Sequence, residues 1–254
     1  MSWQPTQYER FKQERAQPFH DLAALIHPSP GLRVVDLGCG TGALTRELHD
    51  SLAARETLGI DNSAEMLEGS EAIATPSLHF ERRDIETFVA GQPFDLVFSN
   101  AALHWLPDHP SVFRRLLTLL APGGQLAVQM PANESHLSHR TAAEVAAEEP
   151  FRSELAGYQR QSEVLLPEEY AELLYELGLR EQHVELRIYG HELADGSEVV
   201  EWVKGSLLTD YAARLSSDAY GRFVERYRQR LAQAIGEKRP YFYTYRRLLI
   251  WARL

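Results

Sequence analysis

LRVVDLGCGTGALTRELHD, residues 32–50, is the stretch that decides the fold. Its apolar run at 32–37 predicts a buried parallel strand, and residues 42–50 predict a helix that opens directly after it. Glycines at 38, 40 and 42 separate the two and allow a tight turn with a close approach of backbone to ligand. In open α/β sheets such turns lie at the carboxyl edge of the strands, where nucleotides bind. The stretch therefore predicts the first unit of a nucleotide-binding α/β fold.

Acidic residues accompany the glycines. Asp36 stands directly before them, Asp61 ends the predicted second strand, and Asp84 with Ile85 ends the third. A carboxylate after the second strand can accept hydrogen bonds from both hydroxyls of a ribose. The glycine spacing is G-x-G-x-G, whereas dinucleotide-binding turns have G-x-G-x-x-G, and Asp36 is badly placed against a diphosphate. A cofactor with a ribose and a cationic amino-acid tail fits better.

Strands and helices continue to alternate up to residue 130. Further strands are predicted at 57–63, 78–84, 94–100 and 125–130, with helices at 63–72 and 110–124, the latter stopped by Pro122-Gly123-Gly124. Beyond residue 130 the regular alternation of strands and helices ends. Helices are predicted at 138–155, at 167–178 and within 197–236, and strands at 180–193 and 240–254.

This order predicts an α/β fold, because strands separated by helices need right-handed crossovers and a mainly parallel sheet. We expect a Rossmann-like seven-stranded, mainly parallel sheet with helices on both faces and a small helical cap inserted after the fifth strand. The chain, 1–254, is predicted to be one domain. Its additions are an N-terminal helical segment at 1–30 over the cofactor mouth and cap elements at 131–178 and 197–236.

Composition narrows the class of protein. The chain has 254 residues, 24% of them charged and 44% hydrophobic, with one cysteine. No stretch has the roughly 20 apolar residues that span a bilayer, and residues 1–17 have no apolar signal core, so we expect a soluble, cytoplasmic protein. One cysteine closes no intrachain disulfide, and no Cys/His pairs have ligand spacing, so we expect no metal.

Charge is unevenly distributed. The net charge of −10 argues against general nucleic-acid binding, which needs Lys and Arg to neutralise phosphates. Residues 222–254 nevertheless contain nine basic and two acidic residues. This segment is either a solvated basic face or a region that attracts an anionic substrate.

The motif D-x-G-x-G-x-G is matched from Asp36 to Gly42 at every defined position. The chain therefore resembles the class I S-adenosylmethionine-dependent methyltransferases, strongly over residues 31–130. The resemblance implies S-adenosylmethionine as cofactor, S-adenosylhomocysteine as product, and antiparallel sixth and seventh strands. It implies cofactor contacts from Tyr8, Asp36, Gly38, Gly40, Gly42, Asp61, Asn62, Met66, Asp84, Ile85, Asn100 and Ala101.

A narrower likeness lies in four patches: Asn100 to His109, Leu126 to Asn133, the opening Trp3-Gln4-Pro5, and the aromatic, arginine-rich end. In these the chain resembles the trans-aconitate methyltransferase family. The likeness implies O-methylation of a carboxylate on a small polyacid that resembles trans-aconitate.

His104 and Trp105 are the candidate catalytic residues, since they follow the fourth strand, where the family places acceptor contacts. His104 is either a general base for a neutral acceptor or a polar wall residue near the methyl group. A carboxylate is ionised at neutral pH and needs no base, which favours the wall. Trp105 is either core or a wall of the acceptor pocket.

Candidate acceptor-binding residues are Trp3, Tyr243, Arg246 and Arg247. Alternation along the last strand puts Tyr243 and Arg247 on one face and Arg246 on the other. Arginine grips a carboxylate through two parallel hydrogen bonds, so Arg246 or Arg247 is the predicted anchor.

Other functions stay open at this point. The acceptor could be another small metabolite with an oxygen or nitrogen nucleophile and His104 as base. An RNA methyltransferase using the basic C-terminal segment, or a cofactor-binding protein without turnover, are further alternatives.

Overall fold

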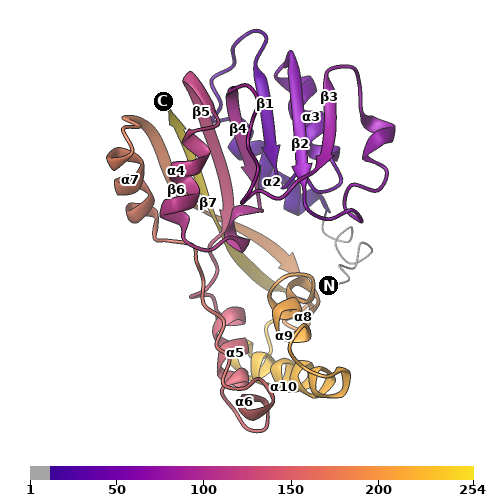
Figure 1. The fold of residues 1–254 in the computed structure, drawn as a ribbon. Coiled ribbons are helices and arrows are strands. Elements are labelled where there is room, and N and C mark those ends of the chain that lie inside the picture. The colour runs from indigo at the N-terminus through magenta and orange to yellow at the C-terminus, as the bar shows by residue number, and fades with distance from the viewer. Residues whose placement is uncertain (1–11) are drawn as a thin grey trace. The chain divides into compact units, whose positions relative to one another are not determined.

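The structure is a computed structural model that describes residues 12–254, and its centre is a seven-stranded sheet (Figure 1). The strands are β1 (Arg33–Leu37), β2 (Glu56–Asp61), β3 (Leu78–Arg82), β4 (Phe94–Asn100), β5 (Leu120–Pro131), β6 (Glu181–Leu193) and β7 (Tyr241–Arg253). Their order in the sheet is β3-β2-β1-β4-β5-β7-β6. The pairs β1–β2, β2–β3, β1–β4 and β4–β5 are parallel, and β7 runs antiparallel to β5. The predicted Rossmann-like, mainly parallel sheet is confirmed.

Helices and short 3-10 helices connect the strands. The helices are α2 (Lys12–Ala23), α3 (Ala43–Ser51), α4 (His109–Leu117), α5 (Leu137–Ala146), α6 (Phe151–Glu154), α7 (Pro167–Glu176), α8 (Glu198–Lys204), α9 (Leu207–Ala212) and α10 (Ser217–Ile235). The 3-10 helices are η1 (Ser70–Ile73) and η2 (Leu103–Trp105). Among the described residues, no helix is long and apolar enough to cross a membrane.

Helices cover both faces of the sheet, as predicted. On one face, Phe19 and Leu22 of α2 and Leu48 of α3 share a core with strand residues that include Val34 and Phe98. Figure 1 shows α4 on the opposite side of the sheet, where it contacts β5. The ring of Phe113 on α4 lies 5.2 Å from that of Tyr170 on α7, so α7 packs on α4. Strands β1, β4 and β5 are therefore largely buried, which explains their apolar runs, whereas β3 at the sheet edge is mostly exposed.

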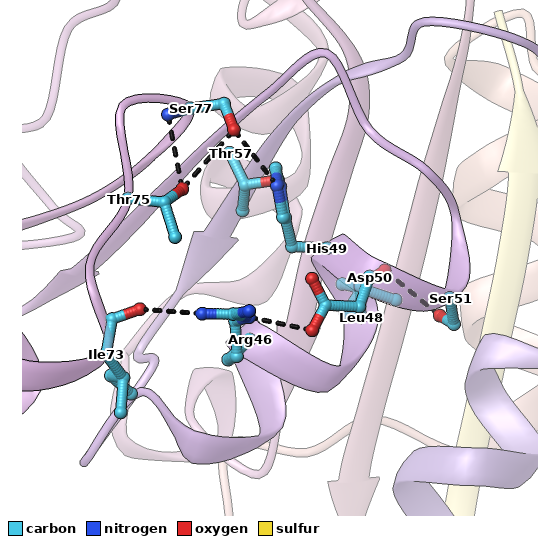
Figure 2. Close-up of polar contacts among 9 residues, drawn as sticks. All are labelled: Arg46, Leu48, His49, Asp50, Ser51, Thr57, Ile73, Thr75 and Ser77. Atoms are coloured by element: carbon cyan, nitrogen blue, oxygen red, sulfur yellow. Dashed lines mark hydrogen bonds and ion pairs between the residues drawn. The ribbon is translucent and has the colours of Figure 1, made fainter.

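A buried polar network fixes α3 against the sheet (Figure 2). His49 is 8% exposed; its Nδ1 lies 2.8 Å from the Thr57 hydroxyl on β2 and its Nε2 lies 3.2 Å from the Ser77 hydroxyl before β3. Nearby, Arg46 donates to the Asp50 carboxylate at 2.7 Å and to the Ile73 carbonyl at 3.2 Å. Burial lowers the pKa of His49, so the neutral ring is the form that this network stabilises.

Two predicted helices have other bounds. The helix predicted at 63–72 is wrong: turns occupy residues 64–69, followed by η1. Gly69 has φ of 90°, a left-handed conformation that a helix cannot continue through. The helix predicted at 110–124 ends at Leu117, because Leu120 already pairs with Phe94 and the Pro-Gly-Gly sequence lies within β5.

The helical stretch predicted at 138–155 forms two helices, α5 and α6. Pro150 stands between them as the N-cap of α6, and proline cannot donate the backbone hydrogen bond that a continuous helix needs. The region predicted at 197–236 contains α8, α9 and α10.

The chain divides into two compact units. The larger comprises residues 16–131, 163–187 and 247–254, and therefore includes α7; of the described residues, the smaller comprises 12–15, 132–162 and 188–246. In the smaller unit, the ring of Phe223 on α10 stacks on Tyr211 at 4.7 Å and meets Phe151 edge-on at 5.3 Å. That the chain is a single domain, with caps at 131–178 and 197–236, stays a prediction.

Candidate active site

The glycine turn after β1 is fastened to the end of β2. The amides of Gly38 and Cys39 both donate to the carbonyl of Ile60, at 2.8 and 2.9 Å. The amide of Gly40 donates to Oδ2 of Asp61 at 2.9 Å, and the amide of Ser63 donates to Oδ1 of the same carboxylate at 2.9 Å. Asp61 therefore shapes the turn, while each of its oxygens keeps a lone pair for a further donor.

Loops that follow four different strands meet at this turn. A Cβ atom on Gly38 would lie 2.2 Å from Cβ of Ala102, after β4, and 3.6 Å from Cδ1 of Ile85, after β3. A Cβ atom on Gly40 would lie 2.9 Å from Cε of Met66, after β2. Both glycines have positive φ, 82° and 57°. The predicted residues Gly38, Gly40, Met66 and Ile85 are thus brought together at the carboxyl edge of the sheet.

The aromatic ring of Phe80 packs against the glycine turn. Phe80 on β3 fills the space beside two glycines: a Cβ on Gly42 would lie 2.5 Å from its ring, and a Cβ on Gly59 of β2 would lie 2.7 Å away. Gly42, at the start of α3, has φ of 78°. The third glycine of the motif is therefore required by packing against Phe80 as well as by backbone conformation.

Asp36 is a buried acid directly beneath the turn. It is 4% exposed, and the hydroxyl of Thr45 on α3 donates to its Oδ2 at 2.6 Å. Desolvation by burial raises the pKa of Asp36 to about 7, outweighing the stabilisation of the ionised form by the Thr45 hydrogen bond. Asp36 is therefore an acid whose charge state changes near neutral pH.

The remaining predicted cofactor residues surround this centre. Asn62 is exposed and its carbonyl accepts from Nε of Arg82 at 3.0 Å. Asp84 is exposed, with Oδ1 accepting from the amide of Glu86 at 2.7 Å. Ala101 adopts φ of 54° and donates its amide to the carbonyl of Gln129 at 2.9 Å.

At the end of β4, the side chain of Asn100 carries a buried oxygen, Oδ1, that has no hydrogen-bond partner in the part of the chain that the structure describes. Asn100 pairs in register with Gln129 of β5, whose Nε2 is also buried and without a partner. Residues in register on parallel strands share a sheet face, so these two amides are neighbours on the side covered by α2 and α3. An unpaired acceptor and an unpaired donor thus lie side by side at the edge that carries the glycine turn.

His104 and Trp105 lie on η2, directly after β4. Their ring centroids are 4.7 Å apart, and Trp105 is 58% exposed, so it is not a core residue within the described structure. The large exposed ring agrees with a pocket wall, although its role as a catalytic residue stays a prediction.

A buried histidine at the start of α4 holds η2 in place. His109 is 1% exposed, and Tyr170 of α7 hydrogen-bonds its Nδ1. The amide of Leu165 donates to the Tyr170 hydroxyl at 3.3 Å, which leaves the hydroxyl proton for Nδ1 of His109. Nε2–H of His109 then donates to the carbonyl of Leu103 at 3.2 Å. Burial lowers the pKa of His109, in agreement with this neutral tautomer.

The predicted acceptor residues of the last strand are divided between the units. Arg246 belongs to the smaller unit, where its Nη1 donates to the Ser135 hydroxyl at 2.9 Å. Arg247 belongs to the larger unit and lies opposite Pro131 of β5, which places it on the same sheet face as Gln129. Tyr243 is 2% exposed and its ring lies 5.2 Å from that of His136. Trp3 and Tyr8 lie outside the described residues.

The arginine stripe of α10 has a structural role. Arg226 and Arg230 both donate to the carboxylate of Glu148, which follows α5, and Arg222 donates to Glu154 of α6. These three guanidinium groups therefore fasten α10 to α5 and α6. Much of the basic character of residues 222–254 is balanced within the smaller unit.

Comparison with known proteins assigns the family. A family model described as "Methyltransferase domain" matches residues 28–177. The chain is 43% identical over 251 residues to "Trans-aconitate 2-methyltransferase" of Deinococcus radiodurans, covering 96% of each chain. The chain belongs to the trans-aconitate 2-methyltransferase family.

Solved structures agree on the fold of this methyltransferase. A putative methyltransferase from Bacillus halodurans matches with a TM-score of 0.58 at 15% identity, over 92% of this chain and 97% of that one. Phosphoethanolamine N-methyltransferase 2 of Haemonchus contortus, solved with S-adenosylhomocysteine, matches with a TM-score of 0.55 at 18% identity, over 93% of this chain and 52% of that one. The methyltransferase family and fold give S-adenosylmethionine as the cofactor.

The residues present fit that cofactor. Met66 and Ile85 bring apolar side-chain atoms to the glycine turn, and such atoms suit contact with an adenine ring. Free lone pairs on Asp61 suit ribose hydroxyls, and the unpaired Oδ1 of Asn100 suits an ammonium donor. The contacts themselves stay predictions.

Sequence reasoning missed Gln129, His109 and Tyr170. Gln129 stands within an apolar strand and resembles core, and its signal is the mismatch of an amide inside that strand. His109 and Tyr170 lie 61 residues apart, and neither has a local pattern that predicts their hydrogen bond.

Proposed function

We propose that this methyltransferase transfers the methyl group of S-adenosylmethionine to a carboxylate oxygen of trans-aconitate or a closely similar polyacid. The observation that carries the proposal is the 43% identity, over 96% of both chains, to a relative named trans-aconitate 2-methyltransferase. Relatives of the same name from other bacteria, at 35–38% identity, support it further.

The chain contributes orientation and electrostatics to this reaction. When bound, the cofactor supplies an electrophilic methyl group on a sulfonium. In this proposal Asp61 and the glycine turn orient its ribose, and Asn100 and Asp36 supply acceptor atoms for its cationic amino-acid end. Because a carboxylate acceptor is already ionised at neutral pH, His104 acts in this proposal as a pocket wall next to Trp105 and transfers no proton.

The acceptor is a small anion in this proposal. Arg247 is its anchor, since register places it on the sheet face that also carries Asn100 and Gln129. Arg246 is the weaker candidate because alternation puts it on the other face of β7, in the smaller unit, where its Nη1 donates to Ser135. A net charge of −10 disfavours a nucleic-acid substrate. A cytoplasmic location stays a prediction.

Calorimetric titration with S-adenosylhomocysteine, followed by a labelled-methyl transfer screen, tests the proposal. The screen contains trans-aconitate, cis-aconitate, saturated tricarboxylates and neutral amines. Transfer to trans-aconitate above the others, with an ester as product, is expected. Transfer only to a neutral acceptor, with a rate that falls when His104 is protonated, would replace the proposal by a base-assisted reaction.

A further inference from the structure

Gln129 carries a buried side-chain amide nitrogen that lacks an acceptor among the described residues. The residue is 1% exposed, and its Nε2 has no hydrogen-bond partner among residues 12–254. A buried donor without an acceptor has lost its hydration and gained nothing in return. Such a group lowers the stability of a protein, so an unpaired donor among the described residues points to an acceptor that those residues do not supply, such as a bound ligand.

Gln125, four residues earlier on β5, shows what a structural glutamine looks like at this position. It shares the sheet face of Gln129 and is 2% exposed. Its Nε2 donates to the carbonyl of His27 at 2.8 Å, and its Oε1 accepts from the His27 amide at 2.9 Å and from Nε1 of Trp251 at 2.8 Å. Near the amino end of β5 both polar atoms of a glutamine side chain thus have partners, whereas near the carboxyl end Nε2 has none among the described residues.

The surroundings of Gln129 favour an anion as the missing partner. Nε2 is a donor and requires an acceptor atom. Arg247, opposite Pro131 on β7, brings a permanent positive charge to the same face. Asn100, the register partner of Gln129, is a predicted cofactor residue at the carboxyl edge of the sheet, where the glycine turn also lies.

We propose that Gln129 is a ligand-binding residue whose amide donates to a carboxylate, with Arg247 supplying the countercharge. Two ligands of the reaction carry that group: the amino-acid end of the cofactor and the polyacid acceptor. The polyacid acceptor as the source rests on the proposed function, whereas the amino-acid end of the cofactor does not. The chemistry recognised is the same, so affinity measurements must separate the two sources.

The test compares Gln129→Leu, which removes the amide at similar volume, with Gln125→Leu as the matched control. Three quantities are measured on each full-length protein: the melting temperature without ligand, the Kd of S-adenosylhomocysteine, and the KM of the acceptor. Gln129→Leu is expected to keep or raise the melting temperature and to weaken one ligand by about tenfold or more. Gln125→Leu is expected to lower the melting temperature, because it leaves His27 and Trp251 without their partner.

Two further measurements show whether the carboxylate belongs to the cofactor or to the acceptor. Methylthioadenosine lacks the amino-acid end, so its Kd stays unchanged in Gln129→Leu if the cofactor is the ligand, while that of S-adenosylhomocysteine rises. If the acceptor is the ligand, both nucleoside affinities stay unchanged and the acceptor KM rises. Gln129→Glu places negative charge against the carboxylate and is expected to weaken the same ligand further.

The proposal is overturned if Gln129→Leu lowers the melting temperature as Gln125→Leu does, or leaves every ligand within twofold of wild type. Failure of the proposed function is a separate result. An enzyme that binds S-adenosylhomocysteine but does not methylate trans-aconitate loses its proposed acceptor. In that case acceptor binding is measured as thermal protection by di- and tricarboxylates in the presence of S-adenosylhomocysteine. If Gln129→Leu alters neither this protection nor the Kd of S-adenosylhomocysteine, the proposed role of Gln129 is refuted.

Discussion

The hydroxyl of Tyr170 on α7 donates to Nδ1 of His109 on α4, and both side chains are buried in the larger unit. Through Nε2, the same imidazole donates to the carbonyl of Leu103, the first residue of η2. The pair therefore connects α7 to the short helix that carries His104 and Trp105. A contact remote from the glycine turn thus sets the position of the candidate acceptor residues.

Removing that hydroxyl should affect the acceptor more than the cofactor. Tyr170→Phe leaves Nδ1 of His109 and the Leu165 amide without their partner, which costs about 1–3 kcal/mol of unfolding free energy. With η2 less fixed, kcat should fall and the acceptor KM should rise, while the Kd of S-adenosylhomocysteine changes little. Steady-state kinetics and calorimetry on one preparation measure all three.

Tyr175→Phe is the matched control on the same helix. Tyr175 is 56% exposed and its ring carries Arg180 at 4.0 Å, a contact that phenylalanine retains. We expect wild-type kinetics and stability from it. Equal loss of cofactor and acceptor binding in Tyr170→Phe would mean that the hydroxyl supports the whole unit, and that His109 does not specifically position η2.

Gly38 and Gly69 both have a left-handed backbone, but only Gly38 also has a close neighbour, so alanine substitutions at the two positions distinguish steric contact from backbone strain. Gly38→Ala and Gly69→Ala both place an L-residue at positive φ, 82° and 90°, which costs about 1–2 kcal/mol each. Only at Gly38 would the added methyl also lie 2.2 Å from Ala102, whereas Gly69 has nothing within 4 Å. Gly38→Ala should therefore lose more stability, measured by urea unfolding, and should abolish measurable S-adenosylhomocysteine binding. Equal stability losses would show that Ala102 moves aside.

Asp36 should make stability depend on pH. Its pKa is about 7 in the folded protein and near 3.8 when unfolded, so folding favours the protonated acid. Stability from this group is complete below pH 3.8 and is lost as pH rises towards 7, by up to about 4 kcal/mol at about 1.4 kcal/mol per pH unit.

Asp36→Asn removes this dependence and keeps an acceptor for the Thr45 hydroxyl. In urea unfolding at several pH values, the unfolding free energy of the variant should rise relative to that of wild type from about pH 4 to 7, after which the difference stays constant. Parallel curves for the two proteins would show that Asp36 is ionised in the folded state at all of these pH values.

Local sequence patterns were sufficient to predict most of the fold. The glycine turn, Asp61 and the apolar strands are all set by neighbouring residues or by periods of two, so each is visible in one stretch of sequence. The helix predicted at 63–72 failed because Gly69 and the Asp61 carboxylate, which accepts from Ser63, favour turns that no helical periodicity reveals. The early start of β5 was missed because Leu120 pairs with Phe94, a long-range contact.

The site was predictable where one motif builds it and not where distant residues meet. Asp36, Gly38 and Gly40 lie in a single stretch. The faces of Arg246 and Arg247 depended on register, which β5 fixes through the pairing of Pro131 with Arg247. The burial of Gln129 and its missing partner are properties of packing, and a strand sequence alone does not show whether an amide is satisfied.

Asp61 supports two structures at once, and its variants should show both. Asp61→Ala deletes the acceptors of the Gly40 and Ser63 amides together with the ribose acceptor, so the Kd of S-adenosylhomocysteine should rise about 100-fold or more. Asp61→Asn keeps one carbonyl oxygen and presents an NH2 group to the other amide, so an intermediate rise of about tenfold is expected. Asp50→Ala, which removes an exposed acid that accepts from Arg46 within the same helix, is the control and should bind as wild type does. Because methylthioadenosine retains the ribose and lacks the amino-acid end, Asp61→Ala should weaken it by the same factor. If the two ligands differ, Asp61 acts mainly through the glycine turn on the amino-acid end, and its assignment to the ribose is wrong.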